Sequence, residues 1–569
     1  MTGRYGAPGS VCVSGRNAPV SRVSAAGAPE CSADDRARRR GDSAAAPKTP
    51  FRVASATGKV VRIGCLLLAG LLPACTVLGP DYQEPDVGWL ERWDATLHGL
   101  AGEGGEAQPL RFWWRVFGDP VLDRLVEVAT ENNRDLRQAA LRIFESRALA
   151  GIATAGRYPQ VQQASGALDY VASTRDAGGG RSFVEYNTAL TVGWELDFWG
   201  RFRRAMESAD AAFFGAIENE RAVQVLVHAD VVDRYFAYRV LQERIRIARR
   251  NAEIQRRSFQ IATEQYHSGN TSELDLQQAK TQYLATLAAI PDLEMRLRQT
   301  ANALAVLLGR VPGDLPELSS AEGSYRLPLA RDLHVSGLPT RLLLRRPDVR
   351  AAAWAVAAQS ARIGVVLAEL YPAVSLLGTL QWAGGTLAGT PDAGMLTLGP
   401  GLRWNIFDYG AIRNNVRLQD ARLQRTIEAY QNTVLQAVRE VDNAAIAVVK
   451  TEEQAGLLDQ TVASARRALQ IANTRYREGY SDFQRVLDAQ RALVSQTDRQ
   501  VINRGTHLAA VIQLYKGLGG GWSPRAVEAL LPADTRTQMK ERTDWGRLLE
   551  APLPVVPASP APAEEPSRE

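Results

Sequence analysis

The chain has 569 residues, a formal net charge of +5 and an isoelectric point near 9.0. Residues 1–52 contain nine Lys and Arg against four Asp and Glu, so this segment holds the whole basic excess and the rest of the chain is balanced. Binding to nucleic acid needs a standing excess of basic residues along one face, so the composition excludes that class of function.

The N-terminal segment has the features of a leader and an export signal. Residues 1–52 carry no apolar period, and we expect a disordered or non-native leader there. Residues 53–74 have the form of a lipoprotein signal peptide, because the apolar run Ile63 to Leu72 follows a basic stretch and is too short to span a membrane. The sequence Leu-Pro-Ala-Cys that follows resembles a bacterial lipobox, which predicts that Cys75 is lipidated. The alternative is an ordinary signal peptide that ends near a cysteine.

The next segments are predicted to be a tether, a helix and a β-hairpin. Residues 75–112 are rich in Gly, Pro and acidic residues and are expected to be extended. A helix over about 121–155 should end at Tyr158-Pro159, because proline cannot continue a helix. Two strands follow, near 161–171 and 190–198. In the second, apolar side chains recur with a period of two, at Leu190, Val192, Trp194, Leu196 and Phe198.

The same succession of patterns occurs twice. A shift of 210 positions relates Gly200 to Gly410 and Tyr266 to Tyr476, and upstream of the strands the shift is 213. We interpret the chain as a tandem duplication, with repeats over residues 113–320 and 321–522 and a disordered tail over residues 523–569.

The two repeats together supply four strands of about ten residues, long enough to cross a bilayer when tilted. Four strands cannot close a barrel, and an open edge in lipid leaves backbone groups unpaired. We therefore expect three copies of the chain to form a twelve-stranded transmembrane barrel, with aromatic residues as an interfacial girdle. The alternative is a soluble β-sandwich whose aromatic residues form its core.

Very long helices are predicted to follow the strands, over about 201–266 and 411–476, each on the order of 100 Å. The returning helices carry apolar residues every seven positions, which predicts coiled-coil packing. Each returning helix is expected to stack end to end on the helix that enters the strands, with a bend at Pro291. The predicted fold class is an α+β membrane protein: a helical coiled-coil tube and strands of a trimeric barrel.

No candidate active site emerges from the sequence. The five histidines lack metal-ligand spacing, and no Ser or Cys has the surroundings of a nucleophile elbow. The glycine cluster at 517–521 follows a helix rather than a strand, so we do not interpret it as a phosphate loop. We expect no catalytic residue, no metal and no cofactor.

The two turns that join the long and returning helices share one register. Gly269 and Gly479 are predicted to end the long helices, and Ser272 and Ser481 to cap the returning ones. An acidic residue follows each cap, at Asp275 and at Asp488. The simplest interpretation of both acids is helix capping and compensation of the helix dipole.

Several motifs, in order, resemble TolC-type outer-membrane efflux lipoproteins over about residues 75–522. They are Cys75 to Pro85, Trp113 to Leu125, Arg345 to Val349 and Leu518 to Trp522. The resemblance implies a passive, lipid-anchored, homotrimeric exit channel in the outer membrane that exports small molecules such as drugs. Its partners would be a periplasmic adaptor (membrane fusion) protein and an inner-membrane pump.

The resemblance also assigns roles to the turns. It implies that the helix tips close the periplasmic end, with Asp488 at an acidic constriction and Asp275 near it. Arg485 departs from the relatives that carry a second acid there, which leaves ion selectivity open. The adaptor would dock at Tyr266, Gly269, Ser272, Tyr476, Gly479 and Ser481. An alternative within the same class is the outer-membrane component of type I protein secretion, which would use the same kind of channel. A periplasmic coiled-coil adaptor, the alternative of another class, needs lipoyl-like or small β-barrel modules that the sequence does not show.

Overall fold

The structure is a computed structural model. It describes residues 76–93, 96–102, 110–173, 181–319, 327–328, 335–336, 339–385 and 393–557. The predictions for the leader, the signal peptide and Cys75 lie outside these residues.

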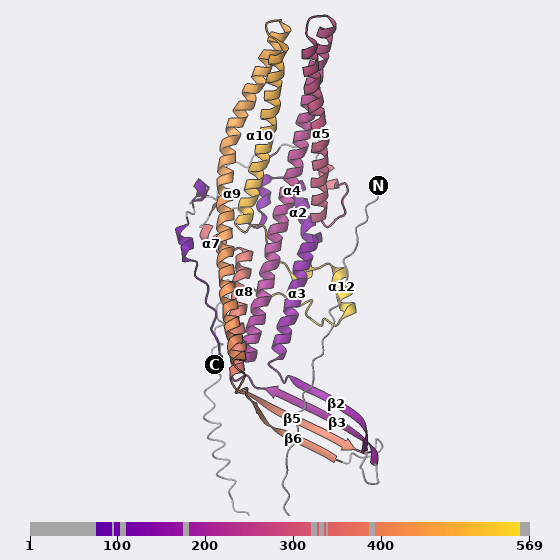
Figure 1. The fold of residues 1–569 in the computed structure, drawn as a ribbon, viewed down its shortest axis with the longest axis vertical. Helices are drawn as coiled ribbons and strands as arrows, with labels where there is room; N and C mark the ends of the chain where they lie inside the picture. The colour runs from indigo at the N-terminus through magenta and orange to yellow at the C-terminus, as the bar shows by residue number, and fades with distance from the viewer. Residues whose placement is uncertain are drawn as a thin grey trace, which may run out of the picture. The chain divides into compact units, whose positions relative to one another are not determined.

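Two long helices organise the described part of the chain (Figure 1). They are α4 (Arg201–His267) and α9 (Ala411–Arg477), and each has 67 residues. Each turns at its tip into a returning helix of 35 residues, α5 (Glu273–Leu307) or α10 (Phe483–Gly517), which packs against it. We call α4 with α5 the first hairpin and α9 with α10 the second hairpin. Helix α5 continues without interruption through Pro291, and the bend expected there stays a prediction.

The single helix expected over 121–155 is in fact two, α2 (Pro120–Asn132) and α3 (Arg134–Ala155). Asn133 has extended backbone, and its side chain accepts hydrogen bonds from the backbone N–H groups of Asp135 and Leu136, which makes it the N-cap of α3. The same side chain donates from Nδ2 to the carbonyl of Leu307 at the end of α5, at 2.9 Å. Helices α5 and α3 therefore meet end to end beside α4, as predicted.

In the second repeat, Arg346 occupies the position equivalent to Asn133. Its guanidinium donates to the carbonyl of Gly517 at the end of α10 (2.8 Å), to Asp348 (2.7 and 3.0 Å) and to Glu440 (3.0 Å). The side chain is only 8% exposed. Arg346 thus joins α10 to α8 (Pro347–Leu367), which packs between α4 and α9. Helix α8, extended to Leu370, is apolar enough to cross a membrane, but most of it is buried in this position, as is typical of a core helix.

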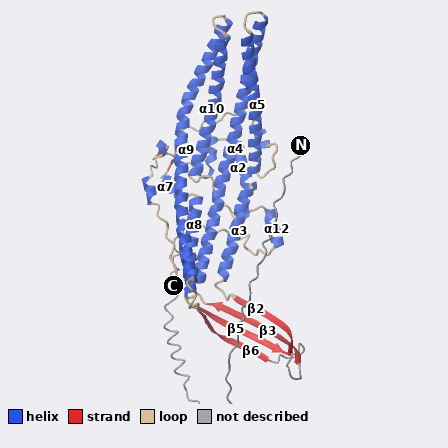
Figure 2. Ribbon diagram, viewed as in Figure 1, coloured by secondary structure: helices blue, strands red, loops and turns tan. Residues whose placement is uncertain are grey.

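The four strands form one antiparallel sheet in the order β2-β3-β5-β6, attached to α4 and α9 (Figure 2). Their bounds are β2 (Val161–Ser173), β3 (Arg181–Glu195), β5 (Ala373–Gly384) and β6 (Ala393–Arg403). Strands β2 and β6 have no partner on their outer edges within the described residues. Half of the backbone hydrogen-bonding groups of these two strands are therefore open to another chain.

The strand register divides the sheet into two faces, because residues directly opposite each other in an antiparallel pair point to the same side. One face is apolar, and its members include Leu190, Val192, Trp194, Leu376, Leu380, Trp382, Leu396, Leu398 and Leu402. The other, which we call the polar face, includes Gln163, Asp169, Glu185, Thr191, Glu195, Thr379, Gln381 and Arg403. Leu398 is 72% exposed and Leu402 69%, so no second layer of the described residues covers the apolar face, and the alternative of a soluble sandwich is wrong.

The residues that follow Cys75 are held between α4 and α8. The buried side chain of Arg204 donates to the carbonyls of Leu78 (3.0 Å) and Gly79 (3.1 Å) and to Asp81 (2.7 Å). Gly79 has φ +97°, and a Cβ atom there would lie 2.5 Å from the Cα of Gly364. The backbone N–H of Leu78 also donates to Trp199 at 3.2 Å, which places the tether at the junction of β3 and α4.

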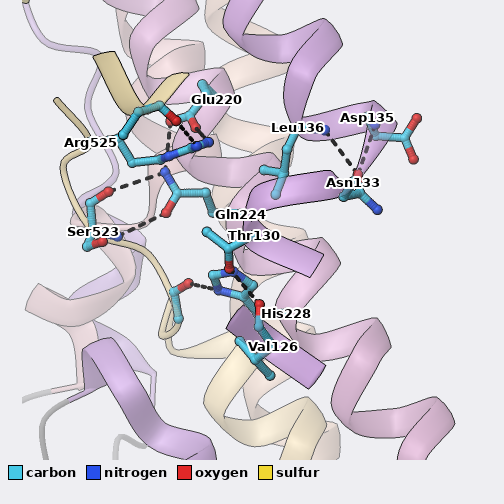
Figure 3. A network of polar contacts seen from close by, with 12 residues as sticks. Val126, Thr130, Asn133, Asp135, Leu136, Glu220, Gln224, His228, Ser523 and Arg525 are labelled. Atoms are coloured by element: carbon cyan, nitrogen blue, oxygen red, sulfur yellow. Dashed lines mark hydrogen bonds and ion pairs between the residues drawn. The ribbon is translucent and has the colours of Figure 1, made fainter. Parts of the chain in front are cut away.

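The prediction of a disordered tail over 523–569 is wrong as far as residue 557. The segment forms α11 (Val527–Leu530) and α12 (Ala533–Arg542), and Leu549 is fully buried. Gln224 of α4 exchanges two hydrogen bonds with the backbone of Ser523, at 3.1 and 3.2 Å, and Glu220 pairs with Arg525 (Figure 3). Arg147 of α3 donates to three backbone carbonyls, those of Leu548, Ala551 and Pro552.

Short elements complete the described part. They are η1 (Gly88–Arg92), η2 (Leu97–Gly99), η3 (Leu110–Phe117), α6 (Pro316–Ser319), α7 (Pro339–Leu344), η4 (Ala368–Leu370) and a parallel pair of two-residue strands, β1 (Ala101–Gly102) and β4 (Val335–Ser336).

Candidate functional site

The turns at the two hairpin tips have the same backbone. Gly269 (φ +73°) and Gly479 (φ +79°) lie in the left-handed region, which glycine adopts at no steric cost. Their N–H groups donate to the carbonyls of Tyr266 and Tyr476, at 3.0 and 3.1 Å. Both glycines therefore end their helices as predicted.

The caps of the returning helices differ from each other. Ser272 caps α5, accepting a hydrogen bond from the backbone N–H of Asp275 at 3.3 Å. In α10 the cap is Asp482, which accepts from the N–H of Arg485 at 3.3 Å. The prediction that Ser481 is the cap is wrong, because the 210-residue shift aligns Ser272 with Asp482. The hydroxyl of Ser481 is buried and makes no hydrogen bond within the described residues.

The two acids near the tips have different surroundings. The carboxylate of Asp275 accepts from the hydroxyls of Thr271 (2.7 Å) and Ser272 (3.0 Å), so it belongs to the cap of α5. Asp488 is 56% exposed, accepts from Gln484 at 2.9 Å and lies 3.7 Å from the guanidinium of Arg491. The nearest counter-charge to Asp488 is therefore Arg491, one turn after it, and no ion pair joins it to Arg485 in the described part of the chain.

A small apolar cluster joins the two hairpins close to the tips. We call it the tip cluster, and it comprises Ala262, Ala279, Leu469, Phe483, Val486 and Leu487. Tyr476 packs on the ring of Phe483 with centroids 5.1 Å apart, and burial raises the pKa of the Tyr476 phenol. Tyr266, the equivalent residue of the first hairpin, is 37% exposed. The equivalent tyrosines thus present different surfaces.

Polar contacts continue this junction away from the tips. Arg244 of α4 forms a bidentate ion pair with Asp498 of α10, at 2.8 and 3.1 Å. Gln490 donates to Ser258 at 2.7 Å, and Arg491 donates to Gln282 at 3.0 Å. Sequence reasoning missed these contacts, because the partners lie more than 200 positions apart and no repeat pattern relates them.

The buried histidine of α4 has a structural environment. His228 Nδ1 lies 2.5 Å from the carbonyl of Gly521, and Nε2 lies 2.8 Å from the hydroxyl of Thr130 (Figure 3). Burial lowers the pKa of His228 to about 4, so the imidazole is neutral at neutral pH. A neutral ring donates from Nδ1 to the carbonyl of Gly521, which fixes the glycine turn after α10. Its Nε2 faces the hydroxyl of Thr130, which is also 2.7 Å from the carbonyl of Val126. Among the described residues no group of three or more His, Cys, Asp or Glu converges as a metal site.

A family model described as outer membrane efflux protein matches residues 125–310 and again residues 338–520 of this sequence. The chain belongs to the outer membrane efflux protein family. The two matches lie within the repeats inferred from the sequence. As a member of this family the protein is an exit channel of an efflux system in the outer membrane, and the relatives reported below are channel proteins.

Relatives across the family agree with this assignment. The chain is 32% identical to the pyoverdine export outer membrane protein OpmQ of Pseudomonas putida over 474 residues, which are 80% of this chain and 97% of OpmQ. It is 30% identical to the cation efflux system protein CusC of Escherichia coli, over 80% of this chain and 98% of CusC. The solved structure of the outer-membrane channel OprN is similar with a TM-score of 0.71 at 33% identity, over 79% of this chain and 100% of OprN.

Proposed function

We propose that three copies of this chain form one channel, a twelve-stranded barrel in the outer membrane continued by a helical tube into the periplasm. The observation that carries the proposal is the sheet, which has two open edges and one exposed apolar face. In lipid, open edges cost several kcal/mol for each unpaired backbone group, whereas closure by further copies satisfies all of them.

The experiment that tests this proposal is native mass measurement and planar-bilayer conductance of detergent-extracted protein. A conducting trimer is the expected result. A stable monomer in the soluble fraction, without conductance, would overturn the barrel.

The channel would be passive and would receive its substrates from an inner-membrane pump through a periplasmic adaptor. Relatives are named for the export of pyoverdine and for the efflux of toluene and of cations, so a shared channel serves different cargoes. For this chain we propose export of small molecules, drugs among them. The adaptor would dock at the turns, where Tyr480 is 80% exposed and Tyr266 is partly exposed.

We propose further that Cys75 carries the lipid anchor. The tether supports this, because Leu78 is bonded to Trp199 at the strand–helix junction, where the barrel would meet the periplasmic leaflet. Replacing Cys75→Ser is expected to abolish metabolic labelling with palmitate. Cys65→Ser, in the apolar run upstream, should keep the label. Labelled Cys75→Ser protein would contradict the assignment.

The gate is proposed to lie at the hairpin tips, with Asp488 facing the axis. Its carboxylate is exposed in one chain, so three copies can bring it toward the others. Asp488→Ala is expected to raise single-channel conductance, because it removes three charged side chains from the narrowest part of the tube. Asp275→Ala should instead weaken its turn with little change in conductance, because Asp275 bonds to the cap. Unchanged conductance of Asp488→Ala channels would remove Asp488 from the gate.

The ion pair between Arg244 and Asp498 is proposed to keep the second hairpin closed against the first. A double-mutant cycle with alanine at both positions should give a coupling energy of about 0.5–1 kcal/mol, since the pair is bidentate but partly exposed. Each single variant should also raise conductance. The control is Arg249→Ala, which breaks a pair with Glu294 inside the first hairpin and should leave conductance unchanged.

A further inference from the structure

A cavity of about 360 Å³ lies where the sheet joins the long helices. We call it the neck pocket, and the residues that matter here are Glu195, Asp197, Arg201, Glu369, Tyr371 and Arg403. Glu195 and Arg403 belong to the polar face of the sheet by register, because Glu195 lies opposite Ser375 and Arg403 opposite Ala373. In a closed barrel this face lines the lumen, so the pocket opens onto the path of exported solutes.

Three of the five charged groups in the pocket are already engaged. Glu195 accepts from Arg201 at 3.1 Å. Asp197 accepts from the backbone N–H groups of Phe202 and Arg203, at 3.1 and 2.9 Å, at the start of α4. Glu369 and Arg403 are exposed, and neither makes an ion pair or a side-chain hydrogen bond within the described residues. The pocket therefore offers one free carboxylate and one free guanidinium.

An aromatic surface lies beside these two charges. Tyr371 stacks on Trp199, with ring centroids 4.7 Å apart and planes inclined by 29°. The indole of Trp199 donates to the carbonyl of Pro372 at 2.9 Å, which fixes its orientation. Both rings line the cavity, and Tyr371 remains 40% exposed.

We propose that the neck pocket is a transit site for zwitterionic solutes with an aromatic or apolar body. The anionic group of the solute meets Arg403, its ammonium meets Glu369, and its ring lies on Tyr371. A molecule with only one charge is attracted by one of these residues and repelled by the other, so the arrangement favours a solute that carries both. The volume is within the range of small-ligand pockets. The inference rests on the proposed function, since only a closed barrel turns the polar face into a lumen.

The test is block of single-channel current by three probes that share a phenyl ring on a short chain and differ in charge: phenylalanine, phenethylamine and 3-phenylpropionate. Phenylalanine should block at concentrations about tenfold lower than either singly charged probe, a difference equal to one charged hydrogen bond. Arg403→Gln and Glu369→Gln should each weaken the block by phenylalanine about tenfold and leave the trimer intact. Glu185→Gln, an acid on the same face but at the far end of β3, is the matched control and should change the block less than twofold.

Two results would overturn the transit site and leave the channel function standing. In the first, all three probes block the conducting channels equally. In the second, neither variant changes the block by phenylalanine. If the Arg403→Gln protein fails to assemble into trimers, the block of Glu369→Gln channels by phenylalanine tests the transit site by itself. Protein that conducts no current in the absence of any probe would overturn the barrel itself and the site with it.

Discussion

Replacing Arg346 by alanine is expected to lower the free energy of unfolding by about 2–4 kcal/mol. The guanidinium is nearly buried and joins three elements, through Gly517 of α10, Asp348 of α8 and Glu440 of α9. Its removal leaves the carbonyl at the end of α10 without this donor and separates the second hairpin from α8. The urea midpoint of the detergent-solubilised protein, followed by tryptophan fluorescence, measures the loss.

Arg345 provides the matched control for this variant. It is the neighbouring residue, is exposed, and makes no side-chain hydrogen bond or ion pair within the described residues. Arg345→Ala should therefore shift stability by less than about 0.5 kcal/mol. Arg346→Lys should be intermediate, because an ammonium keeps the charge but cannot donate to both carboxylates and the carbonyl. Equal effects of the alanine variants at 345 and 346 would contradict the assigned role.

Replacing Gly79 by alanine is expected to displace the tether and to cost about 2–4 kcal/mol. Two effects add at this position: φ is +97°, and the new Cβ would lie 2.5 Å from the backbone of Gly364 in α8. Neither backbone can move without loss of the contacts that Arg204 makes to Leu78 and Gly79. Limited proteolysis of the tether and the midpoint of thermal unfolding are the measurements.

Alanine at Gly99 is the control that separates the cost of the positive φ from the cost of the contact with Gly364. Gly99 has a similar φ of +93°, but a Cβ atom there meets nothing within 4 Å. Gly99→Ala should therefore show only the backbone cost, about 1–2 kcal/mol, and should leave the tether resistant to protease. If protease cuts the tether equally fast in Gly79→Ala and Gly99→Ala, the contact between Gly79 and Gly364 does not hold the tether in place.

Much of the fold could be predicted because its signals are local and occur twice. Period-two alternation placed the strands, and the glycines at 200, 269, 410 and 479 marked the helix ends that the structure has. The break at Asn133 could not be predicted, because one asparagine in a helical pattern is tolerable unless its side chain finds a partner 174 positions away. The N-cap of α10 was predicted at Ser481, one residue before the true cap at Asp482.

The tail and the junction between the hairpins show the limit of this reasoning. Residues 523–557 have a polar composition that resembles disorder, yet they are held by bonds from Arg147 to backbone carbonyls, which composition does not encode. At the candidate gate, the family resemblance pointed to Asp488, but neither the resemblance nor the residue pattern indicated its counter-charge Arg491 or the pair of Arg244 with Asp498. Such contacts depend on how two hairpins pack, and neither hairpin carries a local signal for it.

The two open edges of the sheet also determine how a faulty copy of the chain affects intact copies made in the same cell. In the proposed trimer, β6 of each copy needs β2 of the next, so one faulty copy leaves a gap that two intact copies cannot close. In a cell that makes intact and faulty chains in equal amounts, about one eighth of randomly assembled trimers contain only intact copies. A substitution that prevents one edge strand from pairing, and leaves the rest of the chain folded, would therefore have a dominant negative effect on channel assembly.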